Sequence, residues 1–204
     1  MSKSSKPSSS SRNTPSKRVL TELSAFASSP HPTIVELQPT DPSNLLALRA
    51  ILTSSPTLPA SYGYAHGRWL LSLSLPPTYP IAPPTITFLT PICHPNVDFC
   101  TGEICLDLLG EAWTPVLGVV GALEAVGRLL GEPGLDSPLG IEVAALGRQG
   151  DGVGVRSLVG YWTGEERFEG GLEDGSAGRE SGRDGKGKGK GKGKGRATVG
   201  GNRT

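Results

Sequence analysis

The stretch from residue 91 to residue 115 holds all three cysteines of this 204-residue chain and one of its three histidines. It reads PICHPNVDFCTGEICLDLLGEAWTP and shows no helical or strand periodicity. A long segment of this kind inside a compact domain is often functional. Because a thiolate is both a good nucleophile and a good leaving group, a cysteine here could carry an acyl group between two partners.

Cys105 stands among apolar neighbours, which is typical of a buried structural cysteine. The preceding residues Thr101, Gly102 and Glu103 indicate instead a turn that brings the chain past a surface. On residue types alone, a structural and a nucleophilic Cys105 both remain open.

His94, Pro95 and Asn96 form the second candidate element. The proline fixes the backbone between two side chains that can hydrogen-bond. Asn96 could donate its amide to a developing oxyanion, or it could cap its own backbone in a turn. His94 could act as a base, although a histidine followed by proline in a tight turn is more often structural.

The same residues could in principle form a zinc site or a protease-type catalytic pair. Cys93, His94, Cys100 and Cys105 fit no common zinc spacing, and an adjacent cysteine and histidine cannot easily share one tetrahedral ion. A protease-type cysteine–histidine pair needs a third residue to orient the histidine, and none is evident. We therefore expect no metal site and no cofactor.

The elements that must position these residues follow from periodicity and punctuation. Thr14 and Pro15 predict the start of a helix that ends before Pro30, with Lys17, Arg18 and Glu22 on its wet side. Four strands joined by proline- and glycine-rich loops should then form an antiparallel meander covered on one face. These strands are expected at residues 33–38, 45–53, 68–75 and 85–89.

Three helices are expected after the cysteine-containing stretch. Thr114 and Pro115 predict a long apolar helix that stops near Glu132. A short helix should run from residue 137 to residue 147, and a last one from 153 to 168. Segregated strands and helices predict an α+β fold.

Composition sets the domain limits and the compartment. A basic Ser-rich tail at 1–13 and a Gly/Lys-rich tail at 170–204 have too little to bury and are expected to be disordered, leaving a core at 14–169. The net charge of +1 and a KGKGKG run without aromatic residues exclude specific nucleic-acid recognition. Three cysteines, no signal peptide and no membrane-length apolar run predict a cytoplasmic protein that would need a partner as a membrane anchor.

Taken together, these elements resemble the ubiquitin-conjugating enzyme family over roughly residues 16–168. The landmarks appear in the family's order. They are KRVLTEL at 17–23, YPIAPPTITF at 79–88, HPN at 94–96, GEICLDLL at 102–109, WTP at 113–115 and EPGLDSPL at 132–139. TGEICLDLL, EAWTPV and LVGYWTGEERF resemble in particular the peroxisomal branch, the peroxin-4 subfamily.

The resemblance implies the ubiquitin-conjugating (UBC) fold, a four-stranded sheet with one N-terminal and three C-terminal helices. It implies an acyl transferase that accepts ubiquitin as a thioester on Cys105, with Asn96 stabilising the oxyanion or ordering the nearby loop. The remaining roles implied by position are structural or concern partners. His94 and Pro95 hold the turn, Asp136 and Ser137 border the acceptor entrance, Lys17 and Arg18 meet the activating enzyme, and Ile81, Pro115 and Val116 meet ligases.

The implied partners are ubiquitin, its activating enzyme and RING-type ligases. The peroxisomal branch adds a membrane anchor of the peroxin-22 type and the import receptor as substrate, at the cytosolic face of the peroxisome. Two departures from the family concern acceptor geometry: Ser137 replaces the more usual aspartate, and the stretch from Asn96 to Cys105 is one residue longer. A non-catalytic ubiquitin-binding variant and a general cytosolic conjugating enzyme are the alternatives.

Overall fold

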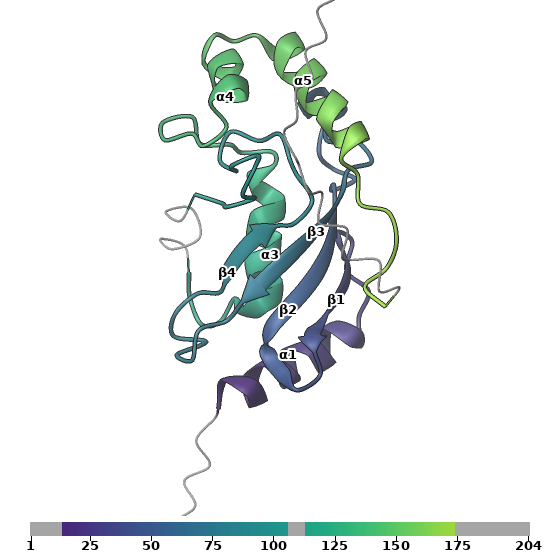
Figure 1. The fold of residues 1–204 in the computed structure, drawn as a ribbon, viewed down its shortest axis with the longest axis vertical. Helices are drawn as coiled ribbons and strands as arrows, with labels where there is room; N and C mark the ends of the chain where they lie inside the picture. Colours follow the sequence, from purple (N-terminus) through teal and green to yellow (C-terminus); the bar gives the residue numbers. More distant parts are fainter. Residues whose placement is uncertain (1–13, 106–112, 174–204) are drawn as a thin grey trace, which may run out of the picture.

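The computed structural model describes residues 14–105 and 113–173 (Figure 1). The tail expected at 1–13, the part of the Gly/Lys-rich tail from 174 onward and residues 106–109 of the GEICLDLL motif lie outside the described residues. Within them, the element order is one helix, four strands and then helices.

Helix α1 (Pro15–Ala27) begins as the sequence predicts, with the Thr14 hydroxyl accepting from the Lys17 amide at 3.4 Å and Pro15 in the first turn. Val19 is fully buried against the core. The assignment of Glu22 to the wet side is wrong, because only 13% of its side chain is exposed. The helix therefore directs one carboxylate into the protein.

The sheet consists of β1 (Ile34–Asp41), β2 (Asn44–Thr53), β3 (Arg68–Ser74) and β4 (Thr85–Phe88), in the order β1-β2-β3-β4 with every pair antiparallel. This confirms the predicted meander. Strand β1 continues through Pro39, past the expected end at residue 38. A proline is tolerated here because β1 is an edge strand and one side of its backbone has no ladder partner.

Alternate side chains of β3 lie on opposite faces of the sheet. Trp69, Leu71 and Leu73 are almost completely buried in the main core, against the helix α3 (Gly118–Leu129) that lies on this inner face (Figure 1). Arg68 and Leu70 point to the outer face, where Leu70 is nevertheless only 4% exposed. The inner face supplies the core that holds the cysteine-containing stretch in place.

Helix α3 begins later than Thr114 and Pro115 suggested. Residues 115–117 form a turn, and the helix starts at Gly118, whose φ is 62°. The amide of Val119 donates to the Glu22 carboxylate at 2.8 Å, so the helix receives its N-terminal acceptor from α1 instead of from a local cap.

Helix α4 (Ile141–Arg148) also begins later than expected, and α5 spans Gly152–Glu165. The amides of Leu139 and Gly140 donate to the Pro95 carbonyl at 2.8 and 2.9 Å. These bonds fasten residues 139–140 to the HPN turn, directly before the first residue of the helix. At the start of α5 the Asp151 carboxylate accepts from the Gly154 amide at 2.8 Å.

After α5 the chain contacts the outer face of the sheet. Arg68 donates to the carbonyls of Phe168 and Gly170 at 3.1 and 2.6 Å, and its guanidinium lies 5.5 Å from the centre of the Phe168 ring. The Leu172 amide donates to Glu36 of β1 at 2.8 Å. The described segment thus extends past the expected core limit at 169. Among the described residues, no helix has the length and apolar character needed to span a bilayer.

Candidate active site

The HPN turn is built around a buried histidine. His94 is 1% exposed; its Nδ1 accepts from the Asn96 amide at 3.0 Å, and its Nε2 donates to the Leu129 carbonyl at 2.9 Å. Burial lowers the pKa of His94 to about 4, against a smaller opposing effect of the Leu129 carbonyl. The imidazole is therefore neutral at neutral pH, and both of its nitrogens are occupied, so it positions the turn and is not available as a base.

The Asn96 carboxamide is occupied as well. Its Nδ2 donates to the Gly134 carbonyl at 2.6 Å, and its Oδ1 accepts from the Gly134 amide at 2.8 Å. The residue is 2% exposed. This paired contact attaches the segment 131–140 to the HPN turn; since an amide nitrogen has two hydrogens, one donor of Nδ2 remains beyond the Gly134 bond.

Segment 131–140 is held by further contacts. Besides the two bonds from residues 139 and 140 to Pro95, the Arg148 guanidinium donates to the Leu135 carbonyl at 2.9 Å. A Cβ on Gly140 would lie 2.3 Å from the His94 carbonyl oxygen, so no larger residue fits there. Asp136 and Ser137 are exposed between these attachment points, on a segment whose course is fixed by the HPN turn.

A tight turn leads from Asn96 to Cys105. Asp98 accepts from the amides of Cys100 and Thr101 at 2.9 and 2.7 Å, and these bonds lower its pKa. Gly102 has a φ of 71°, and a Cβ there would lie 1.8 Å from the Phe88 carbonyl oxygen, so only glycine fits. The turn packs closely against the end of β4.

Cys105 follows directly after this turn. Its amide donates to the Asn96 carbonyl at 3.0 Å, and its side chain is partly exposed as a free thiol. The structure thus brings Cys105 beside the HPN turn, with its backbone bonded to that of Asn96. Between Asn96 and Cys105, the ring of Phe99 lies 4.7 Å from that of Trp162 on α5.

The other two cysteines have different surroundings. Cys93 is half-buried behind the HPN turn, where its carbonyl accepts from the Tyr64 hydroxyl at 3.0 Å. Burial raises the pKa of the Cys93 thiol to about 11, so it stays protonated at neutral pH. Cys100 is exposed. No group of three or more His, Cys, Asp or Glu side chains in the described ranges is arranged to hold a metal ion.

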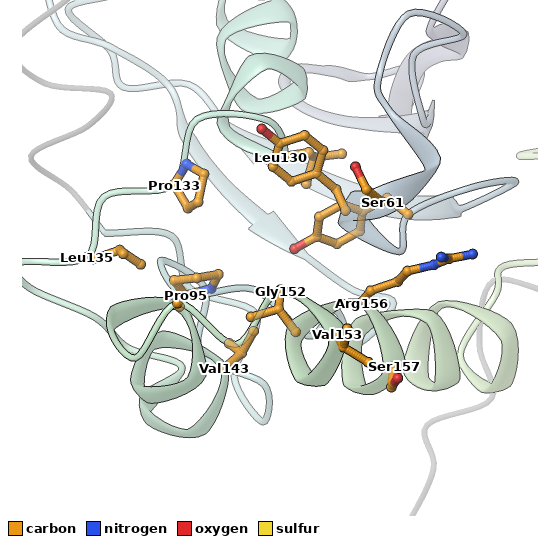
Figure 2. A pocket seen from close by; sticks show the side chains of 15 residues that line it. Ser61, Pro95, Leu130, Pro133, Leu135, Val143, Gly152, Val153, Arg156 and Ser157 are labelled. Atoms are coloured by element: carbon orange, nitrogen blue, oxygen red, sulfur yellow. The ribbon is translucent and has the colours of Figure 1, made fainter.

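A groove of about 710 Å³ lies on another side of the HPN turn, between α5, the turn after α3 and the short 3-10 helix η1 (Ala60–Tyr62) (Figure 2). Pro95, Leu135 and Val143 line one end of it, and Val153 and Arg156 of α5 line the other. Of the described residues, neither Cys105 nor Asn96 lines this groove. The candidate nucleophile therefore lies outside this hollow.

The residues expected to meet partners lie on the surface. Lys17 is exposed and the Arg18 side chain is 39% exposed, while Ile81 and Val116 are 79% and 88% exposed. Trp113 ties the two loops that carry Ile81 and Val116 together, because its indole donates to the Pro80 carbonyl at 3.1 Å. The loops that carry these two exposed aliphatic side chains are therefore held together.

Sequence reasoning missed the role of Gly134, which bonds to Asn96 through its backbone alone. A glycine inside EPGLDSPL indicated a turn but gave no sign of its partner. It also missed Glu22, for which the only signal was a carboxylate one helical turn after Arg18.

Comparison with known proteins identifies the family to which this chain is similar. The family model described as ubiquitin-conjugating enzyme matches residues 18–152. The chain is 44% identical over 159 residues to "Ubiquitin-conjugating enzyme E2 PEX4" of Gibberella zeae, covering 76% of this chain and 91% of the relative. It is 41% identical over 127 residues to "Ubiquitin-conjugating enzyme E2 pex4" of Dictyostelium discoideum, covering 62% and 83%.

Among solved structures, the chain is similar to the H. polymorpha ubiquitin conjugating enzyme Pex4p, crystallised in complex with the soluble domain of Pex22p. The TM-score is 0.68 at 28% sequence identity, over 75% of this chain and 98% of that one. Fold and sequence comparisons thus agree with each other and with the expected peroxin-4 resemblance.

Proposed function

The chain belongs to the ubiquitin-conjugating enzyme family and is a transferase, and we propose that it carries ubiquitin as a thioester on Cys105 and delivers it to the peroxisomal import receptor. The observation that carries the proposal is a partly exposed free thiol whose backbone is bonded to Asn96 of the HPN turn.

The loading step is an acyl exchange between two thiols. The Cys105 thiolate attacks the ubiquitin carbonyl held as a thioester on the activating enzyme; a new carbon–sulfur bond forms, the old one breaks, and the activating enzyme's thiolate leaves. No electron is gained or lost. In the discharge step an acceptor amine or thiol attacks the Cys105-bound carbonyl, loses its proton and displaces the Cys105 thiolate.

A weakly activated cysteine suits a carrier. The neutral, fully bonded His94 cannot take a proton from the Cys105 thiol or from water. A thioester beside such a histidine lacks a general base for hydrolysis and waits for its acceptor. We assign the orientation of the acceptor to Asp136 and Ser137, which are exposed on the segment that Asn96 holds in place.

Asn96 acts on this site mainly through Gly134. Both ends of its carboxamide bond to that residue, so Asn96 orders the segment that borders the acceptor entrance. The second hydrogen of Nδ2 supplies a donor for the carbonyl oxygen during discharge, the usual contribution of such an amide being several kcal/mol.

The peroxisomal part of the proposal rests on relatives. Two curated relatives carry the name PEX4, and the similar solved structure was obtained with the soluble domain of Pex22p. We propose that a membrane anchor of that type recruits this chain to the cytosolic face of the peroxisome, and that RING-type ligases bind Ile81, Pro115 and Val116. Lys17 and Arg18 would meet the activating enzyme.

The first test is loading with ubiquitin. Purified chain, activating enzyme, ATP and ubiquitin should give an adduct that thiol reductant removes. Cys105→Ser should convert it to a reductant-resistant ester, whereas Cys93→Ser and Cys100→Ser should still load. Absence of any adduct on the wild-type chain would favour the non-catalytic ubiquitin-binding alternative.

The second test concerns location and substrate. In cells, the chain should fractionate with peroxisomes only when the anchor is present, and import-receptor ubiquitination should fail in a strain that carries only Cys105→Ala. A chain that remains soluble with and without the anchor, yet still loads, would indicate the general cytosolic alternative.

A further inference from the structure

The Glu22 carboxylate is a junction between three separate parts of the chain. One oxygen accepts from the Tyr79 hydroxyl at 2.7 Å and from the Val119 amide at 2.8 Å. The other accepts from Nε of Arg18. All three donors converge on a side chain that is 13% exposed, where charge-assisted hydrogen bonds are less screened than at an open surface.

Each of the three donors is close in sequence to residues that the proposed function assigns to a protein partner. Arg18 is on the cationic side of α1, and its terminal nitrogen also donates to the Pro115 carbonyl at 3.0 Å. Tyr79 is two residues before the exposed Ile81, and Val119 is three residues after the exposed Val116. The carboxylate therefore lies behind the surface that joins α1 to both apolar loops.

Helix α3 depends on the same carboxylate. Its N-cap residue, Leu117, makes no side-chain capping bond, so Glu22 supplies the anionic acceptor at the positive end of the helix. The space is closely filled, because a Cβ on Gly118 would lie 2.8 Å from the Glu22 carboxylate. Burial and the bond to Glu22 raise the pKa of Tyr79, so its hydroxyl stays a donor.

We propose that Glu22 is a positioning residue that holds the α1 surface and the two apolar loops in one arrangement, so that the activating-enzyme step and the ligase step both depend on it. The proposal rests on the partner surfaces assigned under the proposed function. It adds that the two surfaces are coupled through one carboxylate, and that perturbing either side of this carboxylate affects both steps.

The key variant is Glu22→Gln. A glutamine can place its carbonyl oxygen toward Tyr79 and Val119, but its amide group then faces Arg18 donor to donor. The change therefore cuts the link to Arg18 and retains the others. Tyr79→Phe removes the opposite link alone. Glu124→Gln is the matched control, since Glu124 is an exposed helix carboxylate bonded to His31 at 3.1 Å instead of to Arg18, Tyr79 or Val119.

Three quantities are measured for each variant: the KM and kcat of loading by the activating enzyme, the ligase concentration that half-saturates discharge, and amide hydrogen exchange in residues 76–83 and 113–119. For Glu22→Gln we expect the KM of loading and the half-saturating ligase concentration to rise together, each on the order of tenfold, with kcat changed by less than about twofold. Exchange in residues 113–119 should accelerate. Glu124→Gln should match the wild type.

A double-mutant cycle with Arg18→Ala separates positioning from general destabilisation. If Glu22 acts through Arg18, the two changes should be far from additive in KM. A lowered melting temperature with unchanged KM and ligase response would overturn the proposal, as would a change in only one of the two steps. If wild-type protein does not load at all, the proposed function fails, and unaltered exchange in 113–119 of Glu22→Gln would independently refute the coupling.

Discussion

Replacing Asn96 separates its two candidate roles. Asn96→Ala removes the donor to the Gly134 carbonyl and the acceptor for the Gly134 amide, which are 2.6 and 2.8 Å from the carboxamide. Each bond is worth about 0.5–1.5 kcal/mol, and each backbone group left buried without a partner adds to the cost. We expect a loss of about 2–4 kcal/mol in the free energy of unfolding.

The catalytic consequence depends on the role. If Asn96 served only the oxyanion, discharge would slow by about 10²–10³-fold while stability stayed near that of the wild type. If it mainly orders segment 131–140, slow discharge accompanies the lost stability and faster amide exchange in residues 133–140. We expect the second pattern, because both ends of the carboxamide are already bonded to Gly134.

The assay is single-turnover discharge of pre-loaded enzyme to a small acceptor, measured beside chemical denaturation and hydrogen exchange. Arg148→Ala loosens the same segment at Leu135 without touching Asn96, and should reproduce part of the slow discharge. Gly134→Ala is the control: a Cβ there lies 3.4 Å from Asn96 Nδ2, an ordinary contact, and the backbone bonds remain. Slow discharge in Asn96→Ala with wild-type stability and exchange would refute the reasoning.

Three further predictions concern stability. Since the pKa of His94 is about 4 in the folded state against an ordinary 6.5, the unfolded chain takes up the proton first; stability from the neutral histidine is full above about pH 6.5 and is lost as pH falls toward 4, by about 3 kcal/mol in total. Denaturation from pH 7 to 4.5 should show this loss, and a His94→Asn variant with the same slope would contradict it. Gly102→Ala should cost about 2–4 kcal/mol, because its φ is 71° and the new Cβ would meet the Phe88 carbonyl oxygen; thermal unfolding checks this, with Gly127→Ala as the control, since nothing lies within 4 Å of a Cβ there. Arg68→Ala should lower stability by about 1–3 kcal/mol and increase proteolysis after residue 165, through loss of its bonds to Phe168 and Gly170; equal protease resistance in variant and wild type would show that the segment is held by other contacts.

Local patterns predicted the elements well and their starting residues less well. The start of α1 was predictable because Thr14 and Pro15 act on the helix that they begin. The starts of α3 and α4 were predicted less well, and the acceptors bonded to the amides at these starts, Glu22 and Pro95, are distant in sequence. At Thr114 and Pro115 the cap-plus-proline pattern marks only a turn, and the helix that follows has its N-terminal acceptor on α1.

The candidate site shows the same division between local and long-range information. The HPN motif and the turn before Cys105 are local, and the sequence indicated both. The partner of Asn96 is the backbone of Gly134. Every residue has these backbone groups, so the residue type at position 134 does not predict the contact. Glu22 was misassigned for a related reason. A carboxylate near Arg18 on a surface helix is typical of a solvent-exposed side chain, and the two groups that bury it, Tyr79 and the start of α3, are distant in sequence.

The match to the family model ends at residue 152, and the chain stays bonded to its sheet beyond that point. Val159 of α5 belongs to the main core, and Arg68 and Glu36 hold residues 168–172. A recombinant fragment cut at residue 152 would lack these contacts and leave Arg68 without the carbonyls that it binds. A fragment that keeps these contacts therefore has to extend at least through residue 172, and an affinity tag or fluorescent fusion belongs downstream of that position.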